Sequence, residues 1–155
     1  MIASAAIDQG VAVVPYGRGE WLTAVRVGAN RDVSQGGELW SRRGIGADVP
    51  TPAIDNGRVY LLGDKGALAC LSLETGETQW EADLPRSRYK YYSSPVIAGD
   101  LIYCVREDGG VVVGRGGDAF ELLAENDLGE PMFATPIPIR EGLLLRGSQH
   151  LFYFK

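Results

Sequence analysis

The segment Thr51–Trp80 alternates short apolar runs with turn residues, and this alternation constrains the fold more than any other feature of the sequence. Asp55-Asn56-Gly57 is a tight-turn signal of the kind that joins antiparallel strands. A second turn follows at Gly63–Gly66, and Thr75-Gly76 leads into a further strand that carries Trp80. The segment is therefore predicted to form three short antiparallel strands and the beginning of a fourth.

The same outline occurs four times along the chain. Its first residues are hydroxyl side chains spaced 47, 43 and 41 residues apart, at Ser4, Thr51, Ser94 and Thr135. A period of about 40–50 residues with four strands per unit is typical of propeller blades. We therefore predict an all-β protein, a β-propeller of about four four-stranded blades with the last incomplete. It forms one partial propeller domain over residues 1–155, with blades at approximately 4–46, 51–85, 94–128 and 135–155.

Details of the repeats give further expectations. The extra length of the first repeat, residues 28–36, is polar and glycine-rich and is interpreted as a surface excursion. The fourth repeat stops at Lys155, before any fourth strand. One apolar position near the start of each third strand is expected to fill the same layer between blades; its residues are Leu22, Leu68, Val111 and Leu151.

Composition excludes several classes of function. A formal net charge of −5 argues against nucleic acid as a partner, because phosphate binding needs a basic face. No apolar run approaches the ~20 residues of a membrane-spanning helix. With one histidine and two separated cysteines, Cys70 and Cys104, the sequence offers no transition-metal cluster of the usual kind. Whether those cysteines pair stays open, since a disulfide needs Cα atoms within ~7 Å.

Three pieces of the second repeat resemble the pyrroloquinoline-quinone (PQQ) enzyme-type repeat: Gly57–Tyr60, Ala69–Ser72 and Glu74–Trp80. The resemblance covers nearly the whole chain. It implies an arc of a quinoprotein-like propeller, part of a ring of about eight blades. It also implies that tryptophans at the end of the fourth strand dock each blade on its neighbour. Trp40 and Trp80 match that position, whereas Ala124 stands there in the third repeat.

Members of this family include quinoprotein dehydrogenases and outer-membrane assembly lipoprotein-like propellers, and one fold hosts many functions. The dehydrogenases need a calcium site and a vicinal disulfide, but Cys70 and Cys104 are not adjacent. The acidic pairs at Glu107-Asp108 and Glu125–Asp127 are interpreted as solvated turn carboxylates, not calcium ligands. His150 is interpreted as an exposed edge residue. We predict no catalytic, cofactor-binding or metal residues, and no bound PQQ despite the repeat type.

The segment Arg86–Tyr92 is the densest cluster of charged and aromatic side chains, and it lies between the second and third repeats. The candidate partner-binding residues are Arg86, Arg88, Tyr89, Lys90 and Tyr91. In an extended segment the three cations would share one side, with Tyr89 and Tyr91 turned towards the blade. Arg42-Arg43 is expected to extend a basic strip along this face. The alternative is a solvated connector without a binding role.

The sequence therefore favours a non-catalytic protein-interaction or binding scaffold. We expect it to be the C-terminal part of a longer exported bacterial protein, located in the periplasm or otherwise outside the cytoplasm. The expected partner is a protein, or a second copy joined through open blade edges such as the apolar run Leu151–Phe154. No nucleic acid and no transmembrane segment are expected. The alternatives are a fragment of a PQQ-dependent quinoprotein oxidoreductase and a carbohydrate-binding propeller.

Overall fold

The computed structural model describes residues 3–28 and 36–155, and their regular structure consists of fifteen strands. These two ranges contain no helix, and so none long and apolar enough to cross a membrane. The strands form three four-stranded sheets and one three-stranded sheet, each with its strands paired in chain order. Blade 1 comprises β1 (Ala6–Asp8), β2 (Val11–Tyr16), β3 (Trp21–Arg26) and β4 (Glu38–Arg43); blade 2, β5 (Ala53–Asp55), β6 (Arg58–Leu62), β7 (Ala67–Ser72) and β8 (Thr78–Asp83); blade 3, β9 (Val96–Ala98), β10 (Leu101–Val105), β11 (Gly110–Gly116) and β12 (Phe120–Asp127); blade 4, β13 (Ile137–Ile139), β14 (Gly142–Arg146) and β15 (Leu151–Phe154).

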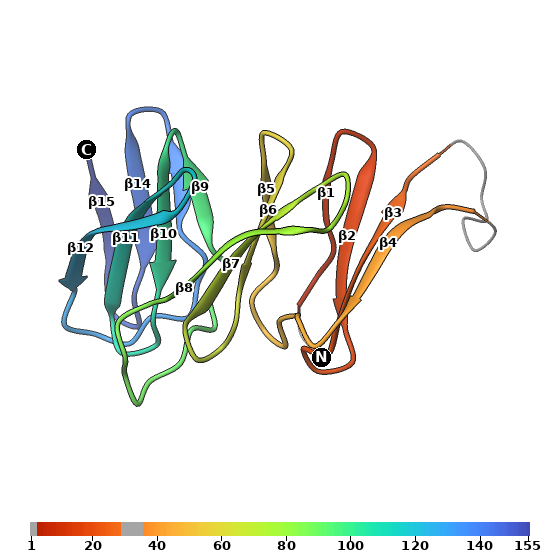
Figure 1. Ribbon diagram of the computed structural model, residues 1–155. Helices are drawn as coiled ribbons and strands as arrows, with labels where there is room; N and C mark the ends of the chain where they lie inside the picture. The colour runs from red at the N-terminus through yellow and green to blue at the C-terminus, as the bar shows by residue number, and fades with distance from the viewer. Residues whose placement is uncertain (1–2, 29–35) are drawn as a thin grey trace.

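All strand pairs are antiparallel, and the four sheets stand side by side in chain order (Figure 1). The predictions of an all-β protein and of a partial propeller whose last blade is incomplete are confirmed. The expected surface excursion of residues 28–36 falls almost wholly outside the described residues. Turn chemistry explains the first hairpin of blade 2, because Asn56 (φ 48°) and Gly57 (φ 73°) both adopt the left-handed conformation of a type I′ turn.

A chain of hydrogen bonds joins the first residues of the four repeats. The amide of Ser4 donates to the Thr51 hydroxyl (2.9 Å), and the amide of Thr51 donates to the Ser94 hydroxyl (2.9 Å). The amide of Ser94 in turn donates to the Thr135 hydroxyl (3.1 Å). Blades 2, 3 and 4 therefore each begin by accepting one hydrogen bond from the blade before, which fixes the position of neighbouring blades along the strand direction.

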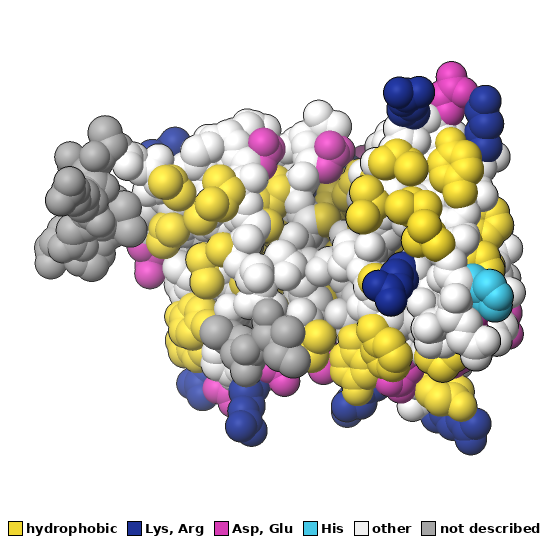
Figure 2. Space-filling view, turned by 180° about the vertical axis from the view of Figure 1, so that it is seen from behind, with side chains coloured by type: hydrophobic (Ala, Val, Ile, Leu, Met, Phe, Trp, Pro, Cys, Tyr) yellow, Lys and Arg dark blue, Asp and Glu magenta, His cyan; other side chains and the backbone are white. Residues whose placement is uncertain are grey.

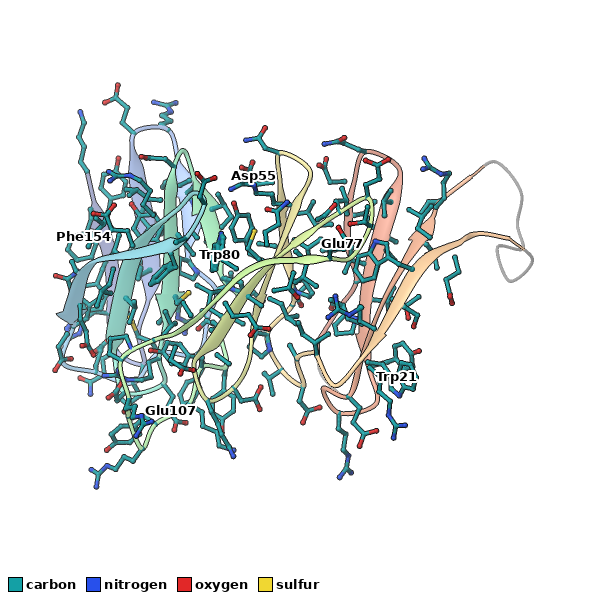
Figure 3. The ribbon with its side chains drawn as sticks, in the orientation of Figure 1. Trp21, Asp55, Glu77, Trp80, Glu107 and Phe154 are labelled. Atoms are coloured by element: carbon teal, nitrogen blue, oxygen red, sulfur yellow. The ribbon has the colours of Figure 1, made fainter. Side chains whose placement is uncertain are left out.

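The hydrophobic core lies between blades, in three separate clusters. Two of them contain a buried tryptophan of the fourth strand. The Trp40 indole nitrogen donates to the backbone oxygen of Leu73 in blade 2 (2.9 Å), and that of Trp80 donates to the oxygen of Gly117 in blade 3 (3.0 Å). Figure 3 shows Trp80 between the second and third sheets. Each indole thus buries a large apolar ring and satisfies its single donor in the next blade.

The third interface differs at the residue that the sequence singled out. In the strand registers, Trp40 pairs with Ala24, Trp80 pairs with Cys70 and Ala124 pairs with Val113. A register shift follows immediately in all three blades, so the positions are equivalent. Blade 3 therefore presents a methyl group where blades 1 and 2 present an indole.

The expected apolar layer is correct for three of its four residues. Leu22, Leu68 and Val111 are buried, each against the following blade. Leu151 is 64% exposed, because it faces away from blade 3 and no other sheet of the described residues packs against it. Hydrophobic side chains accordingly gather on the surface of the half of the molecule that contains blade 4 (Figure 2).

Candidate functional site

The candidate site lies along the edge of the row of blades at which the chain passes from one blade to the next, and we call this edge the rim. The connections between blades and the turns between second and third strands share this rim, and Figure 3 places Glu107, from the β10–β11 turn, on it. Lysine and arginine side chains are prominent along the same rim in Figure 2. We refer to the segments that join consecutive blades, residues 44–52, 84–95 and 128–136, as the first, second and third crossings.

The second and third crossings are held by equivalent hydrogen bonds at both ends. Leu84 donates to the oxygen of Gly66 (2.9 Å), and Leu128 donates to that of Gly109 (3.1 Å). At the other end, the amide of Tyr91 donates to the backbone oxygen of Asp64 (2.9 Å), and the amide of Met132 donates to the backbone oxygen of Glu107 (3.0 Å). These anchors are seven residues apart in the second crossing and four in the third. The second crossing therefore carries three residues more than this span requires.

The surplus forms a protruding segment, residues 86–90, which we call the basic excursion. All five of its side chains are exposed. The Arg88 guanidinium lies over the Tyr89 ring, 4.8 Å from its centre, and donates to the Tyr89 hydroxyl (2.8 Å). No carboxylate of the described residues forms an ion pair with Arg86, Arg88 or Lys90. The excursion thus concentrates three unneutralised cations on one turn.

The two tyrosines of the candidate set take different positions. Tyr91 is 1% exposed and packs in the core between blades 2 and 3, as expected for a residue turned towards the blade. Burial raises the pKa of its phenol, and the nearby Arg106 acts in the opposite direction. Tyr89 is exposed, contrary to the expectation that both rings point inwards. Tyr91 is therefore an anchor that a partner cannot reach, whereas Tyr89 is accessible.

Arg106 fixes the blade beneath the excursion, and sequence reasoning missed it. Its side chain is almost buried and forms ion pairs with Asp108 (2.8 Å) and Glu125 (2.9 Å). Desolvation raises the pKa of Asp108, but the hydrogen bond from Arg106 and one from the amide of Gly110 outweigh it, so that the pKa is lowered overall. The interpretation of Asp108 and Glu125 as merely solvated turn carboxylates is therefore wrong. Glu107 also serves the excursion, since its carboxylate accepts the amide of Lys90 (3.0 Å).

Arg42 and Arg43 do not extend the excursion into a basic strip. Both belong to β4 and not to the first crossing. Arg42 donates to the backbone oxygen of Gly76 in blade 2 (2.5 Å), and Arg43 lies over the Trp21 ring, which itself stacks on Tyr16. The first is thus used for blade packing and the second for covering an aromatic pair.

His150 has an acidic neighbour that lies twenty residues away in sequence. Its ring is 68% exposed, in agreement with the interpretation as an edge residue, but Nδ1 lies 2.9 Å from the Glu130 carboxylate. Glu130 also accepts the amides of Gln149 (3.3 Å) and His150 (2.9 Å). By accepting these two amides, the Glu130 carboxylate caps the β14–β15 turn. A substrate-facing role has no support in this geometry.

The described ranges contain no candidate metal site and no reactive thiol. No group of three or more histidine, cysteine, aspartate or glutamate side chains there is placed to hold a metal ion. Cys70 and Cys104 are both free and buried in one cluster. Burial raises the pKa of the Cys70 thiol to about 11 and that of Cys104 to about 12, so neither thiolate is populated at neutral pH.

Comparison with known proteins agrees with the blade geometry. Residues 4–118 match the PQQ_2 family, described as outer membrane protein assembly factor BamB. The chain belongs to this family. The match covers blades 1 and 2 and most of blade 3, including the basic excursion, and stops short of blade 4.

Individual relatives of this BamB family member are distant and longer. BamB of Salmonella typhimurium is 25% identical over 128 residues, which are 76% of this chain and 31% of the relative. BamB from Moraxella catarrhalis has a TM-score of 0.75 at 14% identity, covering 97% of this chain and 44% of that one. The computationally designed Ika4 protein gives 0.78 at 13% identity, covering 99% and 90%. The chain thus spans about a third to a half of these BamB proteins, and the structures support the fold alone.

Proposed function

We propose that this chain is a non-catalytic interaction module of an outer-membrane assembly factor, acting outside the cytoplasm, and that the basic excursion contacts an acidic segment of a protein partner. The observation that carries the proposal is the surplus of the second crossing: three residues beyond the span, with three exposed cations and no ion pair among the described residues. The family description supports assembly as the cellular role.

The basic excursion is held in a fixed position at its base. Its base is held by Tyr91 in the core and by the two hydrogen bonds between Lys90 and Glu107, so the cations are presented from a fixed platform. The chain as a whole is acidic, which makes a local basic cluster a specific landmark for an acidic partner. One exposed ion pair contributes only about 0–1 kcal/mol, so recognition must come from the cluster.

The quinoprotein alternative has less support in the same residues. A vicinal disulfide is impossible for Cys70 and Cys104, which lie in different blades. Of the acidic residues considered as calcium ligands, Asp108 and Glu125 form ion pairs with Arg106, and Glu107 accepts a hydrogen bond from the amide of Lys90. The matching family and the Salmonella typhimurium relative are both described as an outer membrane protein assembly factor. We therefore propose the scaffold role without PQQ.

The test is a charge-matched pair of triple variants. Binding of a fluorescein-labelled peptide of alternating glutamate and serine is followed by anisotropy at increasing NaCl for the parent, for R86S/R88S/K90S, and for R18S/R26S/R146S. The control removes the same charge from exposed arginines elsewhere in the molecule. We expect the first variant to bind at least tenfold more weakly with a flattened salt dependence, and the control to behave like the parent. Equal loss in both variants, or none in either, would refute the proposal.

A further inference from the structure

A groove of about 700 Å³ separates blade 3 from blade 4. Its walls are apolar and include Tyr103 and Val113 on one side, and Leu143 and Phe154 on the other. Charged side chains stand at its two ends, with Asp127 beside the third crossing and Glu141 in the β13–β14 turn. Figure 3 shows the labelled Phe154 near the outer end of β15, at the edge of the molecule. This interface is thus less completely filled than an ordinary contact between packed sheets.

The interface between blades 2 and 3 shows which side chain fills the equivalent position. Tyr103 and Val113 occupy the positions that Tyr60 and Cys70 occupy in blade 2, as the strand registers show. In blade 2 those two residues enclose the Trp80 indole: its ring lies 6.1 Å from that of Tyr60, and Cys70 is its register partner. The blade 3 wall of the groove is therefore built from the same positions that adjoin the Trp80 indole in blade 2.

The position of β12 that is equivalent to Trp80 carries no aromatic ring beside Val113. The residue of β12 that would supply the indole is Ala124, whose side chain ends at Cβ. An indole has about the size and shape to occupy such a slot, and flat aromatic rings favour offset or tilted contact with another ring at 4.5–7 Å. The Tyr103 ring is placed to offer that contact. A ring supplied by another molecule would restore the packing that Trp40 and Trp80 provide at the other interfaces.

We propose that this groove binds a tryptophan side chain carried on an extended segment of a partner protein. The indole enters between Tyr103 and Phe154, and its N–H is directed to the end of the groove at the β13–β14 turn, where the Glu141 carboxylate is an acceptor. This arrangement repeats the chemistry of Trp40 and Trp80, whose N–H groups also donate to oxygens at the edge of the next blade. The site is separate from the basic excursion and does not depend on it.

The test uses N-acetyl-tryptophanamide as the probe and the amide spectrum of the isotopically labelled 155-residue chain as the readout. We expect the probe to shift resonances of residues around the groove, such as Val113, Gly142 and Phe154, and to leave those of blade 1 unmoved. N-acetyl-leucinamide should produce at least fivefold smaller shifts at the same concentration. Absence of shifts at the groove, or equal shifts with leucinamide, would overturn the proposal.

Two substitutions locate the binding. Ala124→Trp should fill the slot from within and weaken probe binding at least tenfold. Leu122→Trp adds the same side chain at an exposed position outside the groove of the same strand and should leave binding unchanged. If Ala124→Trp proves poorly folded, Tyr103→Ala provides the second route, with an expected loss of at least fivefold. Undiminished binding in a folded A124W or Y103A variant would contradict the assignment.

Discussion

Gly76 lies against the indole of Trp40 so closely that a Cβ at position 76 would come within 2.5 Å of Trp40 Cδ2. The glycine belongs to the Thr-Gly-Glu turn of blade 2, and the tryptophan belongs to blade 1. Gly76 also adopts a positive φ of 71° and accepts the Arg42 guanidinium on its carbonyl oxygen. The Thr75-Gly76-Glu77 turn of blade 2 is therefore shaped by the tryptophan of blade 1.

Gly76→Ala should destabilise the chain by about 2–4 kcal/mol, since it combines left-handed backbone strain with a steric conflict. Gly57→Ala is the matched control, because Gly57 has nearly the same φ (73°) but no atom within 4 Å of its Cβ position. It should cost only about 1–2 kcal/mol. Chemical denaturation of both variants checks the difference. Equal losses would mean that the contact with Trp40 is unimportant.

Trp80→Ala should cost about 3–5 kcal/mol, the usual range for removing a buried tryptophan. The variant loses the hydrogen bond to Gly117 and the ring contacts with Tyr60 and Phe120. Trp21→Ala serves as the comparison, because Trp21 stacks on Tyr16 at the surface and should cost roughly 1 kcal/mol. Thermal unfolding of the two proteins gives the measurement. If Trp21→Ala destabilised the protein as much as Trp80→Ala, the result would contradict the docking role of Trp80.

The main features of the fold could be predicted from the sequence because turn chemistry is local and the repeats reinforce one another. Alignment of the repeats placed Ala124 where Trp80 stands, and the family resemblance implied the docking role of that position; the register with Val113 confirms the placement. The pairing of Arg106 with Glu125 escaped prediction because Arg106 follows β10 and Glu125 lies on β12, so the two meet only when both strands pair with β11. The alternation of Tyr89 and Tyr91 failed because the excursion turns, with the amide of Tyr89 donating to the Ser87 hydroxyl, instead of running as an extended strand.

The stability contributed by Arg106 should depend on pH. The folded-state pKa of Asp108 is lowered below its ordinary 3.8, so its contribution is present above that value and is lost as the pH falls through the folded-state pKa. Arg106→Met should therefore destabilise the chain by about 2 kcal/mol at neutral pH, with the difference from the parent shrinking below about pH 4. Arg115→Met, which disrupts an exposed pair with Asp100, should change little. Urea titrations at several pH values test this, and a pH-independent loss in R106M would contradict it.

Both cysteines should resist modification in the folded chain. Their thiols are buried, and the pKa values of about 11 and 12 leave almost no thiolate at pH 8. We expect two thiols to react with a maleimide only after unfolding, with no gel shift between reduced and unreduced samples. Rapid labelling of the native protein would show that the core between blades 2 and 3 opens readily. Loss of both thiols under non-reducing conditions would indicate a disulfide.

Photo-crosslinking from the basic excursion in cells of the source organism is the most direct test of the claim that this surface meets a protein partner. A photoreactive amino acid replaces Ser87 between the two arginines, or Ser148, an exposed residue of the β14–β15 turn on the same rim. We predict one discrete adduct with an envelope protein from position 87, its loss when Arg86, Arg88 and Lys90 are changed to serine, and no equivalent adduct from position 148. Identical adducts from both positions, or none from position 87, would contradict the account.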